Sequence, residues 1–297
     1  MRFAVFAVAP LVVLASACSA APQPASAPVT GPASASAQGT TGSVPSASTP
    51  SSTSAPAQPS APPSIASAVI GPRLSGVSVV VALGDSVPFG SACGCAPYPS
   101  LLAKQLSHVT GHAVSSVNDA RPGFTSTDVL TQVQTSASVI ADIRSAGVVT
   151  LEIGANDIAY SAACGAVASC YAPTLPQVQA NITSIVQRIR SLTADRPVAI
   201  VLLDYWNVWL GGRYAAAQGP AYVAASTSLT HAESVMISAI AQSTGSAYVD
   251  LRLAFRGPDD ADDETGLLAP DGDHPNAAGH AEIADVTGQT LLQALPA

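Results

Sequence analysis

The sequence predicts a three-layer α/β/α domain built on a doubly wound parallel sheet, and two observations support this. Strand-like and helix-like stretches alternate from about residue 69 onward, which is typical of βαβ units. The strand-like stretches are short, apolar runs that end in turn residues, as expected for strands covered on both faces. Right-handed crossovers between such strands place helices on both sides of the sheet.

Five stretches are predicted as strands and six as helices. The strands are 77–83, 113–117, 148–153, 198–203 and 247–250. The helices are 98–110, 126–136, 139–145, 175–192, 222–243 and 277–294. Stretch 175–192 shows the helical period well, because Val178, Ile182, Ile185 and Ile189 recur at intervals of three or four residues.

Composition bounds the function. The chain has 297 residues, of which 48% are hydrophobic, and a net charge of -8. Lys104 is its single lysine, so a nucleic-acid partner is excluded, because binding phosphates needs clustered basic residues. The sequence has no P-loop, dinucleotide glycine motif or metalloprotease helix motif. We therefore expect no cofactor and no metal, and we expect a monomer.

Residues 1–18 are predicted to be a signal peptide. Arg2 precedes a short apolar run over 3–14 and small residues at 15–17. That run is shorter than a membrane-spanning helix. The segment ending at Cys18 resembles a bacterial lipobox, although Ala15 stands where a larger aliphatic residue is usual. Two outcomes stay open, lipidation of Cys18 with membrane anchoring or simple secretion, and both predict an exported protein.

Residues 19–67 consist almost entirely of Ala, Pro, Ser, Thr, Gly and Gln. Such a composition cannot bury enough apolar surface to offset the entropy of ordering the chain. We predict a disordered tether here, followed by one folded domain over 68–297.

A candidate nucleophile follows the first predicted strand. The apolar run there ends in Gly84-Asp85-Ser86, and ligands of open α/β sheets bind at the carboxyl ends of the strands. A serine hydroxyl needs a base to take its proton. His274 precedes the last predicted helix, and a carboxylate at Asp271 can reach its Nδ1 and leave Nε2 free as the base. Asp273 is the alternative partner of His274.

Two further turns end at the same sheet edge. Gly123 follows the second strand, and Gly154-Ala155-Asn156-Asp157 follows the third. Each of these residues has a plain structural explanation as a turn or cap residue. Together with Ser86 and His274, however, they indicate one site at the carboxyl edge of the sheet.

These four blocks, in this order, resemble those of the SGNH hydrolases, also called GDSL lipases and esterases. The resemblance covers about 77–279 and implies a flavodoxin-like, five-stranded parallel sheet. It implies Ser86 as nucleophile, His274 as base and Asp271 as the residue that orients it. It also implies an oxyanion hole formed by the backbone N–H groups of Ser86 and Gly123 and the side chain of Asn156. Val87 and Ala155 depart from the usual leucine and glycine of the family.

The resulting prediction is an exported hydrolase that cleaves short-chain, lipid or acetylated-glycan esters through an acyl-enzyme on Ser86. An acyltransferase would use the same residues. A catalytically silent surface lipoprotein that binds glycan or lipid in the same cleft is the alternative from another class.

Aromatic residues and cysteines complete the predicted site. Tyr205 and Trp206 follow the fourth strand and are predicted to line an acyl or sugar subsite. Four cysteines in an exported domain indicate disulfides. We favour Cys164 with Cys170 and Cys93 with Cys95, while the crossed pairings stay open.

Overall fold

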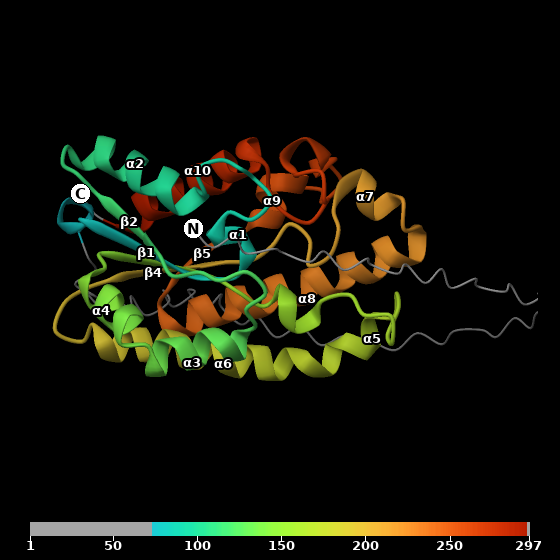
Figure 1. The fold of residues 1–297 in the computed structure, drawn as a ribbon, viewed down its shortest axis with the longest axis horizontal. Helices are drawn as coiled ribbons and strands as arrows, with labels where there is room; N and C mark the ends of the chain where they lie inside the picture. The colour runs from blue at the N-terminus through green and yellow to red at the C-terminus, as the bar shows by residue number, and fades with distance from the viewer. Residues whose placement is uncertain (1–72, 296–297) are drawn as a thin grey trace, which may run out of the picture. The chain divides into compact units, whose positions relative to one another are not determined.

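The computed structural model describes residues 73–295, so the predicted signal peptide, Cys18 and the tether lie outside the described residues. One sheet forms the centre (Figure 1). All its strand pairs are parallel, and the order is β2-β1-β3-β4-β5. The strands are β1 (Val79–Gly84), β2 (Ser115–Asn118), β3 (Val148–Glu152), β4 (Ala199–Leu203) and β5 (Ala247–Val249). The predicted fold class is confirmed.

Helices cover both faces of the sheet, as Figure 1 shows. On one side lie α2 (Tyr98–Thr110), α9 (Leu251–Arg256) and α10 (Ala277–Ala294). On the other lie α3 (Ser126–Thr135), α4 (Ala137–Ser145) and α6 (Leu175–Leu192). The long α8 (Pro220–Thr244) contributes to both apolar clusters.

The alternation of side chains along the strands explains why both faces need cover. In β1, Val80 belongs to the cluster under α2 and α10, whereas Val81 and Leu83 belong to the cluster under α3 and α6. Successive side chains of a strand point to opposite faces. Because both sets are apolar, the strands are continuous hydrophobic runs rather than alternating ones.

The structure adds short elements that the sequence pattern did not predict. These are α1 (Ser86–Phe89), α5 (Ala168–Tyr171), α7 (Gly212–Ala216), the α9 helix named above, and four 3₁₀ turns, η1 (Leu74–Gly76), η2 (Ala155–Ile158), η3 (Ala172–Thr174) and η4 (Glu264–Leu267). Segments of three to six residues are too short to show a hydrophobic period. Most of them lie in loops that follow the carboxyl ends of the strands.

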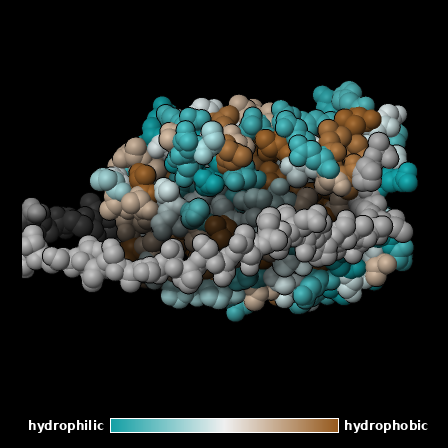
Figure 2. All heavy atoms as spheres, turned by 180° about the vertical axis from the view of Figure 1, so that it is seen from behind, coloured by the Kyte–Doolittle hydropathy of each residue, from teal (hydrophilic) through white to brown (hydrophobic). Residues whose placement is uncertain are grey.

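Where the described residues are visible in Figure 2, hydrophobic and hydrophilic groups lie side by side on the surface. Of the helices in residues 73–295, none combines the length and apolarity needed to cross a bilayer.

Candidate active site

Ser86 lies at the carboxyl end of β1, in a turn that depends on the glycine at position 84 and the aspartate at position 85. Gly84 has a φ of +142°, and a Cβ there would collide with the backbone oxygen of Glu152 on β3. Asp85 then caps α1, because its Oδ1 accepts a hydrogen bond from the backbone N–H of Val87 at 3.0 Å. Ser86 is the first residue of that short helix. The turn thus presents the Ser86 hydroxyl at the sheet edge.

His274 is held by Asp271 at the entrance to α10. Its Nδ1 lies 2.8 Å from Oδ2 of Asp271. The other carboxylate oxygen accepts hydrogen bonds from the backbone N–H groups of Asp273 and His274, each at 3.1 Å. With Nδ1 donating to a carboxylate, Nε2 of the neutral ring is left as a proton acceptor. The ring of His274 is thus hydrogen-bonded to Asp271, one of the two carboxylates considered as its partner.

The hydrogen bonds around Asp271 also set its charge. Partial burial raises the pKa of this carboxyl, but the hydrogen bonds from His274 and from the two backbone N–H groups outweigh that effect, so the pKa is lowered. Asp271 is therefore ionised wherever His274 is to act as a base, and it can stabilise the imidazolium that proton transfer creates.

The start of α10 agrees with the predicted helix over 277–294. Asn276 caps the helix and Ala277 begins it. Oδ1 of Asn276 accepts hydrogen bonds from the backbone N–H groups of Ala278 and Gly279 at 2.8 and 3.1 Å. His274 thus lies two residues before the cap, in the turn rather than in the helix.

Asn156 lies in η2, directly after β3. Its Nδ2 donates a hydrogen bond of 2.9 Å to the backbone oxygen of Phe124. Phe124 follows Gly123, so this bond joins the loops after β2 and β3. One N–H of the amide is used in this way, and the second stays available for a ligand.

Three of the residues predicted for catalysis and the oxyanion hole share one cavity of about 320 Å³. Ser86, Asn156 and His274 all line it, together with Asp273. Asp271 stands behind His274 and is not part of the wall. Gly123 is exposed at a φ of +79° and is also not part of the wall. The cavity therefore brings hydroxyl, imidazole and amide groups from three distant segments to one place.

The backbone N–H groups of two residues that were predicted to form the oxyanion hole are unused. Among residues 73–295, the N–H groups of Ser86 and Gly123 have no hydrogen-bond acceptor. Ser86 is the first residue of α1, where a helix leaves its N–H groups without an intrahelical acceptor, and Gly123 is exposed. Both are thus free to bind an anionic oxygen.

Tyr205 and Trp206 have different places, although they are neighbours. Tyr205 lines the cavity, and its hydroxyl donates a hydrogen bond to Oδ2 of Asp85. Trp206 is 1% exposed and stacks on Phe255 at 4.4 Å between ring centroids. Consecutive side chains after a strand point to opposite sides, so Trp206 packs in the core. Its position does not match our prediction that it binds substrate.

The sequence analysis did not predict most of the aromatic side chains that line the cavity. Tyr160, Trp209 and Tyr222 line it, with ring centroids 5.1 to 5.3 Å apart, and Tyr171 packs on Trp209 at 5.0 Å. Tyr160 is 49% exposed. The aromatic run after β4 contained a signal for Trp209. Tyr222 lies in a long helix, where an aromatic residue reads as core.

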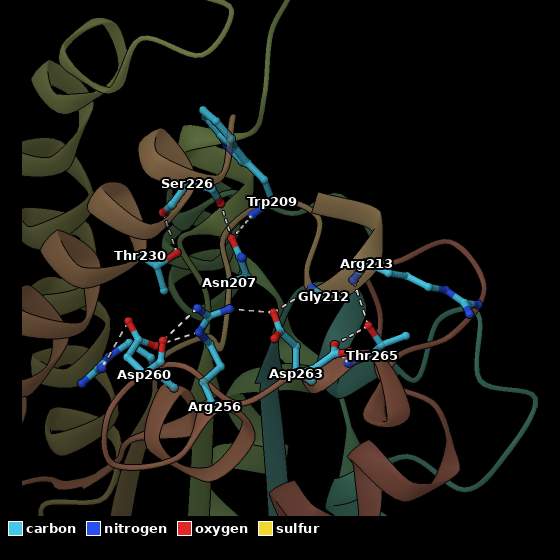
Figure 3. A network of polar contacts seen from close by, with 12 residues as sticks. Asn207, Trp209, Gly212, Arg213, Ser226, Thr230, Arg256, Asp260, Asp263 and Thr265 are labelled. Atoms are coloured by element: carbon cyan, nitrogen blue, oxygen red, sulfur yellow. Dashed lines mark hydrogen bonds and ion pairs between the residues drawn. The ribbon is translucent and has the colours of Figure 1, made fainter. Parts of the chain in front are cut away.

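A polar network fixes the segment that carries Trp209 (Figure 3). Oδ1 of Asn207 accepts hydrogen bonds from the Trp209 backbone N–H, at 3.3 Å, and from the hydroxyl of Ser226 on α8. The indole Nε1 donates to the backbone oxygen of Ile158 at 2.8 Å. These bonds hold the indole in one orientation against the cavity.

The cysteines lie in the predicted pairs at disulfide distance. The Cα atoms are 5.1 Å apart for Cys93 and Cys95 and 5.7 Å apart for Cys164 and Cys170. None of these four residues lines the cavity. The pair Cys164–Cys170 closes the loop that begins just after Tyr160.

Three buried carboxyl groups belong to Asp85, which lines the cavity, and to Glu152 and Glu233. Burial raises the pKa of Asp85 to about 6, against the opposing hydrogen bonds from Tyr205 and Val87. Burial likewise raises the pKa values of Glu152 and Glu233 well above the usual range. Neither glutamate has a hydrogen-bond partner for its oxygens among the described residues. Burial thus favours the neutral form of both carboxyl groups.

The chain is an α/β protein with a cavity at the carboxyl edge of its parallel sheet. Residues 82–282 match the GDSL-like lipase/acylhydrolase family. The chain belongs to this family of esterase- and lipase-type hydrolases. Comparison with curated proteins finds no match.

Solved structures with the same fold include hydrolases of this kind. A lipase from a goat rumen metagenome is 15% identical, with a TM-score of 0.56 over 72% of this chain and 97% of that one. A catalytic mutant of an acetylxylan esterase from Geobacillus stearothermophilus is 20% identical, with a TM-score of 0.53 over 74% of this chain and 97% of that one. At these identities the likeness concerns the fold alone.

Proposed function

We propose that the protein is a serine hydrolase that cleaves uncharged carboxylic esters through an acyl-enzyme on Ser86. The observation that carries the proposal is the hydrogen bond of 2.8 Å between Asp271 and Nδ1 of His274, in a ring that shares a cavity with Ser86. Family membership supports the reaction class.

The steps follow from charge and geometry. His274 Nε2 takes the proton of the Ser86 hydroxyl as its oxygen attacks the ester carbonyl. The N–H groups of Ser86 and Gly123 and the free N–H of Asn156 stabilise the oxyanion. The imidazolium then protonates the leaving alcohol, and water repeats the sequence on the acyl-enzyme.

The cavity wall favours an uncharged substrate. Within residues 73–295 no lysine or arginine lines it, whereas Asp85 and Asp273 do. An anionic substrate would meet no compensating charge there. The aromatic side chains offer apolar contact to an acyl chain or to a sugar ring.

The decisive test is a p-nitrophenyl ester series of increasing chain length on wild type and Ser86→Ala. We expect hydrolysis by wild type and a loss of at least about 10³-fold in kcat for the variant. Ser91→Ala, in a loop outside the cavity, is the matched control and should keep full activity. Equal activity of Ser86→Ala and wild type would overturn the proposal.

We also propose that the protein is exported and anchored through Cys18, on the grounds of the signal-like sequence of residues 1–18 alone. Metabolic labelling with palmitate tests it. Label that is lost in Cys18→Ser supports anchoring, whereas an unlabelled wild type in the medium leaves secretion only.

A further inference from the structure

The loop between α1 and α2 carries Cys93-Gly94-Cys95, and a buried histidine lies against it. A ring nitrogen of His280, on α10, lies within 4.8 Å of both sulfur atoms. The ring is 0% exposed, whereas the two cysteines are only partly buried. A reagent can therefore reach the sulfurs from solvent while the imidazole contacts them from inside.

The hydrogen bonds of His280 define which nitrogen holds the proton. The backbone N–H of Tyr98 donates to Nδ1 at 3.3 Å, so the proton of the neutral ring is on Nε2. Nε2 is buried and has no partner among the described residues. Burial, with the nearby charge of His274, lowers the pKa of His280 to about 4, so the ring stays neutral at ordinary pH.

The Nε2–H of His280 is unused, and one nitrogen of the same ring lies within 4.8 Å of both sulfurs, so a hydrogen bond from this ring to a thiolate would distinguish the two redox forms. A disulfide sulfur is a poor acceptor, but a thiolate is a strong one, and a hydrogen bond to an ionised group is worth more than a neutral one. The reduced form thus gains a bond that the oxidised form lacks. Stabilising the reduced form makes a disulfide easier to reduce.

The small size of the loop that the Cys93–Cys95 disulfide closes also favours easy reduction of this pair. The closed loop of Cys93–Cys95 spans only one intervening residue, whereas Cys164–Cys170 spans five. A shorter closed loop gives less stabilisation through the unfolded chain. Cys93–Cys95 contributes little as a structural crosslink.

We infer that Cys93, Cys95 and His280 form a thiol–disulfide exchange site that accepts electrons from dithiols. A thiolate of the dithiol attacks one sulfur, the Cys93–Cys95 bond breaks, and a mixed disulfide forms. The released cysteine thiolate accepts the hydrogen bond from His280. The second thiol of the reagent then displaces the mixed disulfide, so the protein gains two electrons and two protons and the dithiol leaves oxidised.

The test is a redox titration of the full chain with mixtures of reduced and oxidised dithiothreitol. Acid quenching, differential alkylation and peptide mapping then report each pair separately. We expect Cys93–Cys95 to become half-reduced at a ratio of reduced to oxidised dithiothreitol that is at least about tenfold lower than the ratio that half-reduces Cys164–Cys170. Equal ratios, or a more resistant Cys93–Cys95, would overturn the inference.

His280→Phe removes the donor and keeps a planar ring. We expect the midpoint of Cys93–Cys95 to shift by about tenfold toward stronger reductant, with Cys164–Cys170 as the internal control that stays unchanged. If the substitution shifts the redox midpoints of both cysteine pairs equally, or shifts neither midpoint, the result argues against the role of His280.

A second measurement uses the wild type, so that the inference can be tested even if His280→Phe does not fold. In the reduced wild type, alkylation of the Cys93–Cys95 pair by iodoacetamide should reach half its maximal rate below pH 8.5, the ordinary cysteine value of about 8.5 serving as reference. An ordinary pH profile contradicts the inference. Protection of the reduced pair by one equivalent of Zn²⁺ would make the group a metal site instead, and would also overturn it.

Discussion

Asp271 and Asp273 are two residues apart, yet only Asp271 contacts the ring of His274. The tight turn at Gly272, with a φ of +75°, folds the Asp271 carboxylate back over the backbone N–H groups of the two residues that precede Pro275. Asp273 instead lines the cavity. Sequence spacing left both candidates open, and the backbone of one turn separates them.

We expect Asp271→Asn to lower kcat/KM by about 10²–10⁴, because an amide neither fixes the tautomer nor stabilises the imidazolium. Asp273→Asn, the matched control, should change it by less than about tenfold. Steady-state kinetics on a short-chain ester measures both. A more damaging Asp273→Asn would assign the orienting role to Asp273.

Asn156→Ala is expected to reduce kcat by about 10²–10³ with little change in KM, because the lost donor acts on the oxyanion rather than on the bound ester. Loss of the bond to Phe124 should cost only about 1 kcal/mol of stability. Kinetics combined with urea unfolding separates the two effects. A fall in stability that accounts for the whole loss of activity would remove Asn156 from the oxyanion site.

At the scale of elements, the loop between η2 and α5 determines one wall of the cavity. Tyr171 accepts a hydrogen bond from the backbone N–H of Ser161 and donates one to the oxygen of Gly165, at 3.0 and 2.9 Å. Cys164–Cys170 closes the same loop. The loop is thus tied at several points, with Tyr160 at its start and partly exposed.

On the proposed function, Tyr160 selects the substrate. Tyr160→Ala should raise KM for hexanoyl and octanoyl esters by about tenfold while leaving acetyl ester turnover within about twofold, since only the longer group reaches the aromatic wall. Tyr160→Phe should behave like wild type. Val167→Ala, an exposed apolar residue of the same loop outside the cavity, is the control. Equal effects on acetyl and octanoyl esters would contradict this.

At the scale of the molecule, buried acids shape the pH dependence of stability. Burial raises the pKa values of Asp85, Asp119 and Asp204 to about 6, from 3.8. Between about pH 4 and 6 the folded protein therefore binds more protons than the unfolded chain, so the free energy of unfolding falls as the pH rises. His280, with its lowered pKa, acts in the opposite direction over this range, whereas burial also raises the pKa values of Glu152 and Glu233, which act in the same direction as the three aspartates.

We expect the free energy of unfolding to decrease by an amount on the order of a few kcal/mol between pH 4.5 and 7. Urea unfolding at four pH values in this interval measures it. Asp85→Asn keeps an oxygen acceptor for the Val87 N–H and removes the titration, so its slope should be shallower. Stability that rises steadily to pH 7 would show that the buried acids are not the dominant groups.

Most of the architecture could be predicted from the sequence because it is written in local patterns. The helices over 98–110, 175–192 and 277–294 have the predicted bounds, and each of the five strands lies within one or two residues of its predicted range. Apolar periodicity and turn residues involve only a few neighbouring positions, so they can be recognised from the sequence alone. Two features of the site are also short-range: the tripeptide Gly84-Asp85-Ser86, and the spacing between Asp271 and His274.

The aromatic wall, the core position of Trp206 and the contact of His280 with Cys93 and Cys95 depended on the tertiary structure. Each of them joins segments far apart in the chain, and their side chains take their direction from packing rather than from neighbours in sequence. The sequence by itself determined the sheet and the chemical groups at its edge. Only the tertiary structure decided which side chains surround those groups, because close packing of distant segments fixes the walls of a cavity.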